Sequence, residues 1–345
     1  MTELPEPTHN VVALIDEYHE RNRQKPRPHM GVSMLGHPCE RWLWLSFRWA
    51  VIPKHPGRLL RLFRRGHQEE NNVVYDLRCA GLDVQNTGSR NQARVDFGQH
   101  VSGSMDGIIE SGVPEAPHKR HVAEFKTHNK KSFDSLLKEG VQKAKPDHYA
   151  QMQCYMHGSK IDRALYVAVC KDDDRMYTER VRYVPEVAEG LVARGQRIAM
   201  DNRMPPPLST DPSWYICKWC PAHDFCHQSK LTQEVNCRTC AHATPKEDST
   251  WRCERWDSDG IPVEHQHEGC ESHVLHYDLV PWDVKEGPTE WTFTYIIDGK
   301  DVVNGEGDAT VFASSELIAN PSACANPHDL VQEIRAAWPG ARISK

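Results

Sequence analysis

Three side chains near the middle of the chain have the types and spacing of a metal site. Residues 121–127 alternate as in a strand, so Glu124 and Lys126 lie on one face. Residues 100–109 predict a preceding strand that carries Asp106. If the two strands pair as a hairpin, both carboxylates and the amine meet at one point. Two acids brought together attract a hard cation such as Mg²⁺ or Mn²⁺, because its charge relieves their repulsion.

A metal ion at that point would have a defined chemical use. It can polarise a phosphoryl oxygen and lower the pKa of a bound water. Lys126 beside it can orient that water and stabilise developing negative charge. The pattern Glu-x-Lys alone does not establish such a site, because most such pairs are ion pairs on a solvated sheet. The neighbouring segments must decide between the two interpretations.

Two helical segments contain further candidates. Residues 147–157 predict a helix on which Gln151 and Tyr155 stand four apart and share a face. Residues 59–79 predict a longer helix containing the run RRGHQEE, with Glu70 one turn after the glycine. Gln151 and Tyr155 could instead be ordinary core residues. Glu70 could instead be an exposed acid on a charged helix. The alternatives to Glu70 within that run are His67 and Glu69.

The order SGSMDG, AEFKT, HYAQMQCYMHG resembles the RecB-like branch of the PD-(D/E)XK nuclease superfamily, over about residues 30–230. The resemblance implies a restriction-endonuclease-like fold, which is a mixed β-sheet flanked by helices in an α/β protein. It also implies Mg²⁺ or Mn²⁺ as cofactor and DNA as substrate, either single-stranded or at duplex ends. The residues it places in the site are Asp106, Glu124 and Glu70 as metal ligands, Lys126 as the catalytic lysine, and Gln151 and Tyr155 as the family's Q-x-x-x-Y element.

A first group of cysteines follows the predicted sheet. Cys217, Cys220 and Cys226 have the spacing C-x2-C-x5-C, which indicates metal binding in a chain with no sign of secretion. In iron–sulfur members of the resembling family, such a triplet joins one cysteine far upstream, and Cys39 is in the corresponding place. The resemblance therefore implies a [4Fe–4S] cluster with four thiolates. Zinc is the alternative at this site, with His223 and His227 as substitute ligands.

A second group of cysteines predicts a zinc site. Cys237 and Cys240 form a close pair, and sixteen residues separate Cys253 from Cys270. Two separated pairs of thiolates suit tetrahedral zinc in a small hydrophilic segment with little else to hold it folded. The histidines that could replace a thiolate there are His265, His267 and His273.

The net charge of −6 is unevenly distributed. From residue 236 onward there are 19 acidic and 9 basic residues, which leaves the first 235 residues at about +4. Residues 20–65 contain 11 lysines and arginines and 2 acids, enough to neutralise phosphates if they are not a solvated helix face. The acidic end predicts a protein partner rather than DNA. In the cationic part, Trp42, Trp44 and Trp49 either stack on bases or belong to the core.

The remaining patterns predict four parts. Residues 1–30 form a helix and a basic linker, 31–230 the nuclease domain closed by a cysteine cluster, 231–285 a small cysteine-rich, zinc-binding module, and 286–345 an α+β segment of unknown role. No apolar run reaches the length of a membrane span and no secretion signal is visible, so a cytoplasmic location is expected.

These patterns together favour a DNA nuclease, in particular an exonuclease or end-processing enzyme of recombination, repair or viral DNA metabolism. The alternative is a non-catalytic protein that binds nucleic acid or a partner through a nuclease-like fold. A redox enzyme built on iron and sulfur ranks below both, because the sequence lacks a nucleotide-binding fingerprint.

Overall fold

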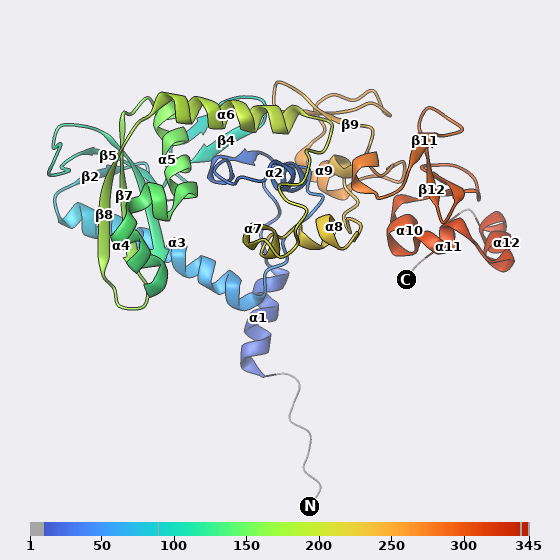
Figure 1. Cartoon of the computed structure of the whole chain (residues 1–345), viewed down its shortest axis with the longest axis horizontal. Coiled ribbons are helices and arrows are strands. Elements are labelled where there is room, and N and C mark those ends of the chain that lie inside the picture. The colour runs from blue at the N-terminus through green and yellow to red at the C-terminus, as the bar shows by residue number, and fades with distance from the viewer. Residues whose placement is uncertain (1–9, 89, 339, 344–345) are drawn as a thin grey trace, which may run out of the picture.

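A five-stranded mixed sheet occupies one end of the molecule, and the C-terminal segment occupies the other (Figure 1). The computed structural model describes residues 10–88, 90–338 and 340–343. The strand order is β2-β5-β6-β7-β8, with β6 and β7 parallel and the other neighbours antiparallel. This confirms the mixed α/β class. The strands are β2 Asp83–Gln85, β5 Gly107–Ser111, β6 His121–His128, β7 Arg163–Cys170 and β8 Met176–Arg182.

Helices cover both faces of this sheet. The 23-residue helix α3, Gly57–Cys79, packs Val73 and Val74 against one face. The crossover between the parallel strands supplies the other layer, with α4, Lys130–Ala144, and α5, Pro146–Ser159. A parallel pair needs such a crossover, because a tight turn cannot reverse the chain twice. The sequence pattern does not predict α4, which the left-handed Gly140 interrupts at φ 71°.

A second, three-stranded sheet adjoins the first and corrects one prediction. Residues 100–109 are not one strand, because β4, Val101–Ser104, pairs in the small sheet, whereas β5 belongs to the large one. Asp106 therefore lies in the connection between two sheets and not on a strand face. The small sheet has the order β1-β4-β3, with β1 Met30–Gly31 and β3 Arg94–Asp96.

The tryptophans near the N-terminus belong to the core. On or just after α2, Glu40–Phe47, Trp42 is 8% exposed and both Trp44 and Trp49 are 1% exposed or less. Arg48 is also buried, and its guanidinium lies over the Trp44 ring at 4.7 Å. The base-stacking interpretation of these rings is therefore wrong, since burial leaves no face for a nucleotide. Core packing is the correct interpretation.

The cysteine-rich segment and the C-terminus form smaller units. The second cysteine group lies at a 3₁₀ turn (Cys237 and Cys240), on a two-stranded sheet (Cys253) and just after α9 (Cys270). A four-stranded sheet with three helices follows around Tyr295 and Leu317. No described helix is both long and apolar enough to cross a membrane.

The remaining helices and strands have the following bounds: α1 Val11–Arg21, α6 Pro185–Met200, α7 Tyr215–Lys218, α8 His223–His227, β9 Ala243–Pro245, β10 Trp251–Cys253, α9 Val263–Glu268, β11 Val284–Glu286, β12 Phe293–Ile297, β13 Lys300–Asn304, β14 Val311–Phe312, α10 Ser314–Ala319, α11 Pro321–Ala325 and α12 Asp329–Ala337, with short 3₁₀ turns η1 Val32–Met34, η2 Cys237–Thr239 and η3 Tyr277–Leu279.

Candidate active site

The structure brings Asp106, Glu124 and Lys126 together. Lys126 Nζ donates a hydrogen bond to Glu124 Oε1 and lies 3.7 Å from Asp106 Oδ2. The same oxygen of Asp106 accepts the backbone N–H of Phe125 at 2.9 Å, which fixes the loop carboxylate against β6. Strands β5 and β6 pair antiparallel, with Gly107 opposite Ala123, so the expected hairpin exists. One ammonium therefore serves two carboxylates from neighbouring segments.

Burial sets the electrostatics of this cluster. The Glu124 side chain is fully buried, whereas 25% of Lys126 and 14% of Asp106 are exposed. Burial raises the pKa of Glu124 to about 8, and Asp106 adds to the rise while Lys126 opposes it. Burial alone would lower the pKa of Lys126, but the two carboxylates outweigh it and raise that pKa. Among the described residues, Glu124 Oε2 has no hydrogen-bond partner, so one buried carboxylate oxygen remains available.

Glu70 faces this cluster from α3. Burial raises the pKa of Glu70, and the charge of Asp106 raises it further, so the two carboxyl groups lie within electrostatic reach. Of the two alternatives, His67 is 73% exposed and contacts Glu70 Oε1 at 3.3 Å, and Glu69 accepts a hydrogen bond from Asn72. Glu70 is therefore the best-placed acid on the helix. An open cavity of about 140 Å³ between α3 and β6 is lined by Gly66, Glu69, Glu70, Val73, Phe125, Lys126 and Thr127.

Gln151 and Tyr155 hold the loop of Asp106 from α5. Tyr155 donates its hydroxyl hydrogen to the backbone carbonyl of Ser104 at 2.6 Å, two residues before Asp106. Gln151 Nε2 donates to the same hydroxyl at 3.3 Å. Both side chains are buried, at 7% and 3% exposure. In this structure the pair orients the loop rather than facing the open cavity.

Sequence reasoning missed a polar group beside the lysine. The buried Tyr166 hydroxyl contacts His128 Nε2 at 2.8 Å and His148 Nδ1 at 2.9 Å. A signal existed, since His128 follows Lys126 by two residues on the same strand face, and His148 precedes Gln151 by one helical turn. Tyr166 itself lies within an apolar strand, so the sequence pattern indicates only an ordinary core residue.

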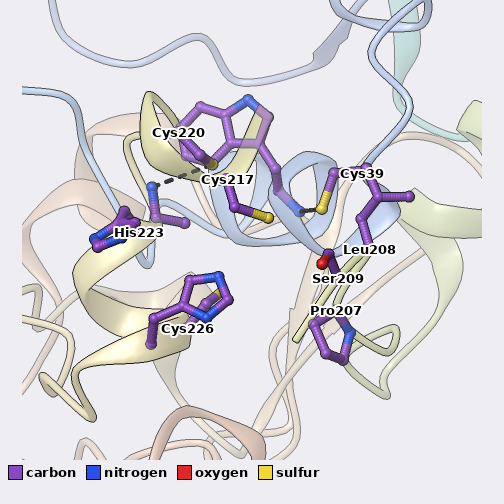
Figure 2. A pocket seen from close by; sticks show the side chains of 11 residues that line it. Cys39, Pro207, Leu208, Ser209, Cys217, Cys220, His223 and Cys226 are labelled. Atoms are coloured by element: carbon purple, nitrogen blue, oxygen red, sulfur yellow. Dashed lines mark hydrogen bonds between the residues drawn. The ribbon is translucent and has the colours of Figure 1, made fainter. Parts of the chain in front are cut away.

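Four cysteines line one pocket (Figure 2). Cys39, the N-cap of α2, enters from one element, whereas Cys217, Cys220 and Cys226 come from α7, α8 and the loop between them. Burial raises the pKa of the last three thiols, to about 11 for Cys220, and the neighbouring sulfurs add to the effect. A cation would have to displace their protons. The alternative ligands His223 and His227 line the same pocket.

The second group of cysteines is also gathered. Burial raises the pKa of Cys237 to about 11, with Cys270 and Cys253 contributing, and raises that of Cys240 to about 12. His273 is occupied by other partners, because its ring nitrogens contact Ser314 Oγ at 2.8 Å and the Asn236 carbonyl at 3.1 Å. The segment is held by more than its thiols, since Trp251 and Arg238 are buried in the core. The premise that little else holds this segment together is therefore wrong.

All twelve cysteines are free thiols. Within residues 10–88, 90–338 and 340–343, no group of three or more histidine, cysteine or acidic side chains is already arranged to hold a metal ion. In the cluster of Asp106, Glu124 and Lys126, the Lys126 ammonium pairs with both carboxylates.

No protein-family model matches the chain, and no curated protein is significantly similar in sequence. Among solved structures, SSO0001 superposes with a TM-score of 0.41 at 16% identity, over 63% of this chain and 96% of its own. LHK-Exo, an alkaline exonuclease from Laribacter hongkongensis, superposes with a TM-score of 0.34 at 16% identity. The superposition covers 53% of this chain and 90% of LHK-Exo. A phage-related exonuclease from Haemophilus somnus 129PT superposes with a TM-score of 0.29 at 17% identity. The superposition covers 38% of this chain and 66% of that exonuclease. Likenesses this distant assign no activity, so the function must be argued from the side chains.

The arrangement combines converging carboxylates, an amine within reach of them and an open cavity at their side. Paired carboxylates are the ligands that hard cations prefer, and an amine can stabilise an oxyanion.

Proposed function

We propose that the chain is a divalent-metal-dependent DNA nuclease. One observation carries the proposal: Asp106 and Glu124, from two different segments, share the single ammonium of Lys126, with Glu70 facing them from α3. A buried acid with a strongly raised pKa is costly to keep, and such groups cluster at functional sites. A surface ion pair would need none of this burial.

The carboxylates fit a hard cation in number and chemistry. Asp106, Glu124 and Glu70 supply oxygen ligands only, and the unpaired Oε2 of Glu124 is a buried acceptor that lacks a donor among the described residues. When bound, Mg²⁺ or Mn²⁺ would polarise the phosphate and make a water molecule more acidic. Because Lys126 pairs with both acids, an ion would compete with it for their oxygens.

The protein's own side chains then have separate tasks. Lys126 donates a hydrogen bond to a phosphate oxygen and offsets the negative charge that grows as the phosphorus–oxygen bond breaks. Phe125 N–H keeps Asp106 pointed at β6, and Tyr155 fixes the backbone just before it. Gln151 supports that tyrosine from the same helix.

DNA would approach along α3, where Arg65 and Lys171 lie beside the cavity. Arg65 donates to the Lys171 carbonyl at 3.1 Å, and both residues line a small pocket next to Thr127. Their charges suit backbone phosphates on either side of the cut. An exonuclease or end-processing role in recombination, repair or viral DNA metabolism is the finer form of this proposal.

Two cysteine sites complete the proposal. Cys39, Cys217, Cys220 and Cys226 would hold a [4Fe–4S] cluster, with zinc as the alternative, and Cys237, Cys240, Cys253 and Cys270 would hold Zn²⁺. What supports these sites is that four thiols line one pocket at the first and that the thiols of the second lie close enough to affect one another's pKa. The first site would join α2 to α7 and α8 and so close the nuclease part.

One observation favours a second candidate, a non-catalytic binding protein. Lys126 pairs with both acids, so an ammonium already supplies positive charge to the cluster. The fold would then bind nucleic acid, and its acidic C-terminal region would bind a protein partner.

Digestion of end-labelled DNA separates the two candidates. Single-stranded and duplex DNA are incubated with Mn²⁺, with Mg²⁺ or with a chelator, and the products are sized. We expect cleavage that needs the metal and is lost in Asp106→Asn. The exposed Asp76→Asn on α3 is the matched control and should cleave normally. Metal-independent DNA binding without any product would support the second candidate instead.

A further inference from the structure

A chain of hydrogen bonds runs behind the catalytic lysine and has no part in the proposed chemistry so far. Tyr166 on β7 contacts His128 Nε2 at 2.8 Å and His148 Nδ1 at 2.9 Å. His128 continues to Ser132 Oγ at 3.0 Å, and Lys145 donates to that same oxygen at 2.6 Å. The chain thus links β6, β7, α4 and α5 through polar side chains within one core.

The two histidines must play opposite roles toward the tyrosine. A phenol has one hydrogen to donate, so only one of the two imidazole nitrogens can accept it, and the other must itself donate. Both rings are neutral near pH 7, because burial lowers the pKa of His128 to about 4 and that of His148 to about 3. Two uncharged groups in complementary tautomers therefore hold the hydroxyl from two sides.

Strand register shows what the held ring does. Tyr166 pairs with Glu124, but its hydroxyl reaches His128, four residues further along β6 on the same face. The ring must therefore lean along the strand past Lys126, which lies between those two residues. The register partner of Lys126 is Ala168, whose single methyl group leaves room for the ring. The phenol lies close enough to Lys126 for the charge of the ammonium to act on the pKa of Tyr166.

We propose that His128 and His148, by clamping Tyr166, keep the Lys126 ammonium directed at Glu124 and Asp106. Tyr166 is then a positioning residue for the reaction. This inference rests on the proposed function for its kinetic effect but not for its geometric one. A four-carbon side chain has several rotamers, and a fixed ring reduces them to the one that reaches both acids.

Kinetics of Tyr166→Phe give the first test. This variant keeps the ring but removes the hydroxyl that both histidines hold. We expect kcat for Mn²⁺-dependent DNA cleavage to fall on the order of tenfold while KM for DNA stays the same, since small displacements of a catalytic group have such effects. His148→Gln should retain more activity than His148→Ala, because an amide can still bond to the phenol.

The matched control is Tyr183→Phe. Tyr183 contacts His157 Nδ1 at 2.6 Å, so this control breaks the same kind of bond away from the lysine. Both variants should lose similar thermal stability, but only Tyr166→Phe should lose kcat. Equal kcat values in the two variants would overturn the inference.

A second readout does not depend on activity. Acetylation of Lys126 by an amine-reactive reagent is followed over time by mass spectrometry in the full-length protein. We expect Tyr166→Phe to acetylate several times faster than wild type or Tyr183→Phe, because its amine is less firmly held. Unchanged acetylation would overturn the inference even in an active nuclease. Faster acetylation in a protein that cuts no DNA would sustain the clamp and remove the proposed function.

Discussion

Burying the Glu124 carboxylate destabilises the folded protein, and its contacts offset part of that loss. Removing a carboxylate from water costs several kcal/mol, even after relaxation of the surroundings. Lys126 offsets part of this cost through a direct ion pair, but one oxygen stays without a donor among the described residues. A residue kept only for stability would be replaced by an apolar one of the same volume. The cost therefore points to a role in binding a cation.

Replacing Glu124 tests that role directly. Glu124→Gln keeps the shape and removes the charge, so Mn²⁺ affinity measured by calorimetry should fall at least about tenfold, as loss of a charged ligand requires. Glu139→Gln, an exposed acid on α4, should bind Mn²⁺ like wild type. Equal affinities in the two variants would mean that Glu124 is not a ligand.

The sequence alone predicts part of this residue-scale picture. Glu124 and Lys126 are visible because strand alternation places them on one face, and Asp106 because it precedes them in a hairpin. Tyr166 is not, because an apolar strand gives no sign that a hydroxyl inside it meets two imidazoles from other elements. Which polar side chains meet inside a core is decided by register and crossover packing.

At the scale of elements, the break between β4 and β5 positions the loop acid. Gly103 lies on β4 just before this break and is closely packed, since a Cβ there would stand 2.9 Å from Val32 and 3.0 Å from Tyr155. The glycine lets β4 approach both η1 and α5. The sequence pattern hides this break, because the alternation of residues 100–109 continues through it.

Gly103→Ala should therefore destabilise the fold and disturb the site. We expect a loss of about 1–3 kcal/mol in the free energy of unfolding, as overpacking of cores commonly costs. Gly190→Ala on α6 is the matched control, because nothing lies within 4 Å of its Cβ position. That helical glycine should gain up to about 1 kcal/mol on substitution. Urea denaturation compares the two, and equal effects would contradict the packing argument.

The cysteine pocket ties elements distant in sequence, which gives a test of the first metal site. Anaerobically purified protein should be brown and contain iron as well as zinc. Cys39→Ser should lower the iron content and the melting temperature together, because Cys39 alone links α2 to the other three thiols. The exposed Cys79→Ser should change neither. Colourless protein containing only zinc would replace the cluster with zinc and leave the nuclease proposal intact.

Sequence patterns predict the long elements better than their boundaries with one another. The helix expected over 59–79 is α3, and the strand expected over 121–127 is β6, because both have sustained periodicity. Helix α4 escapes prediction because Gly140 interrupts its pattern. The buried tryptophans of α2 show the same limit, since an aromatic helix looks alike whether it meets DNA or the core.

For the whole molecule, Arg238 attaches the cysteine-rich segment to the N-terminal part. Its guanidinium donates to the carbonyls of Phe47 and Pro28 and lies 3.8 Å from the centre of the Trp49 ring. His267 stacks on the same tryptophan, with the centres of the two rings 4.0 Å apart. The boundary predicted between residues 230 and 231 thus crosses a packed interface.

Buried histidines make the whole fold sensitive to acid. Burial lowers the pKa of His100, His128 and His273 to about 4 and that of His276 to about 2. A lowered folded-state pKa means that the unfolded chain takes up protons first, from about pH 6.5 downward. Stability is therefore present above that pH and is lost as the pH falls toward 4.

Between pH 7 and pH 5, each of these histidines should remove up to about 2 kcal/mol of stability, at roughly 1.4 kcal/mol per pH unit below its unfolded pKa. Melting temperature against pH measures the loss. His276→Gln should flatten the curve, whereas the exposed His118→Gln should not. A melting temperature independent of pH over this range would contradict the assignment of neutral, buried rings.

The central claim is that Lys126 and two acids form a phosphodiester-cutting site, and Lys126→Ala tests it most directly. Cleavage of end-labelled DNA in Mn²⁺ is measured for wild type, Lys126→Ala and the exposed control Lys138→Ala, with folding checked by circular dichroism. We expect a loss on the order of 10²- to 10³-fold in Lys126→Ala, as removal of one oxyanion-stabilising donor produces, and none in the control. A folded Lys126→Ala that cuts DNA at the wild-type rate would contradict the account.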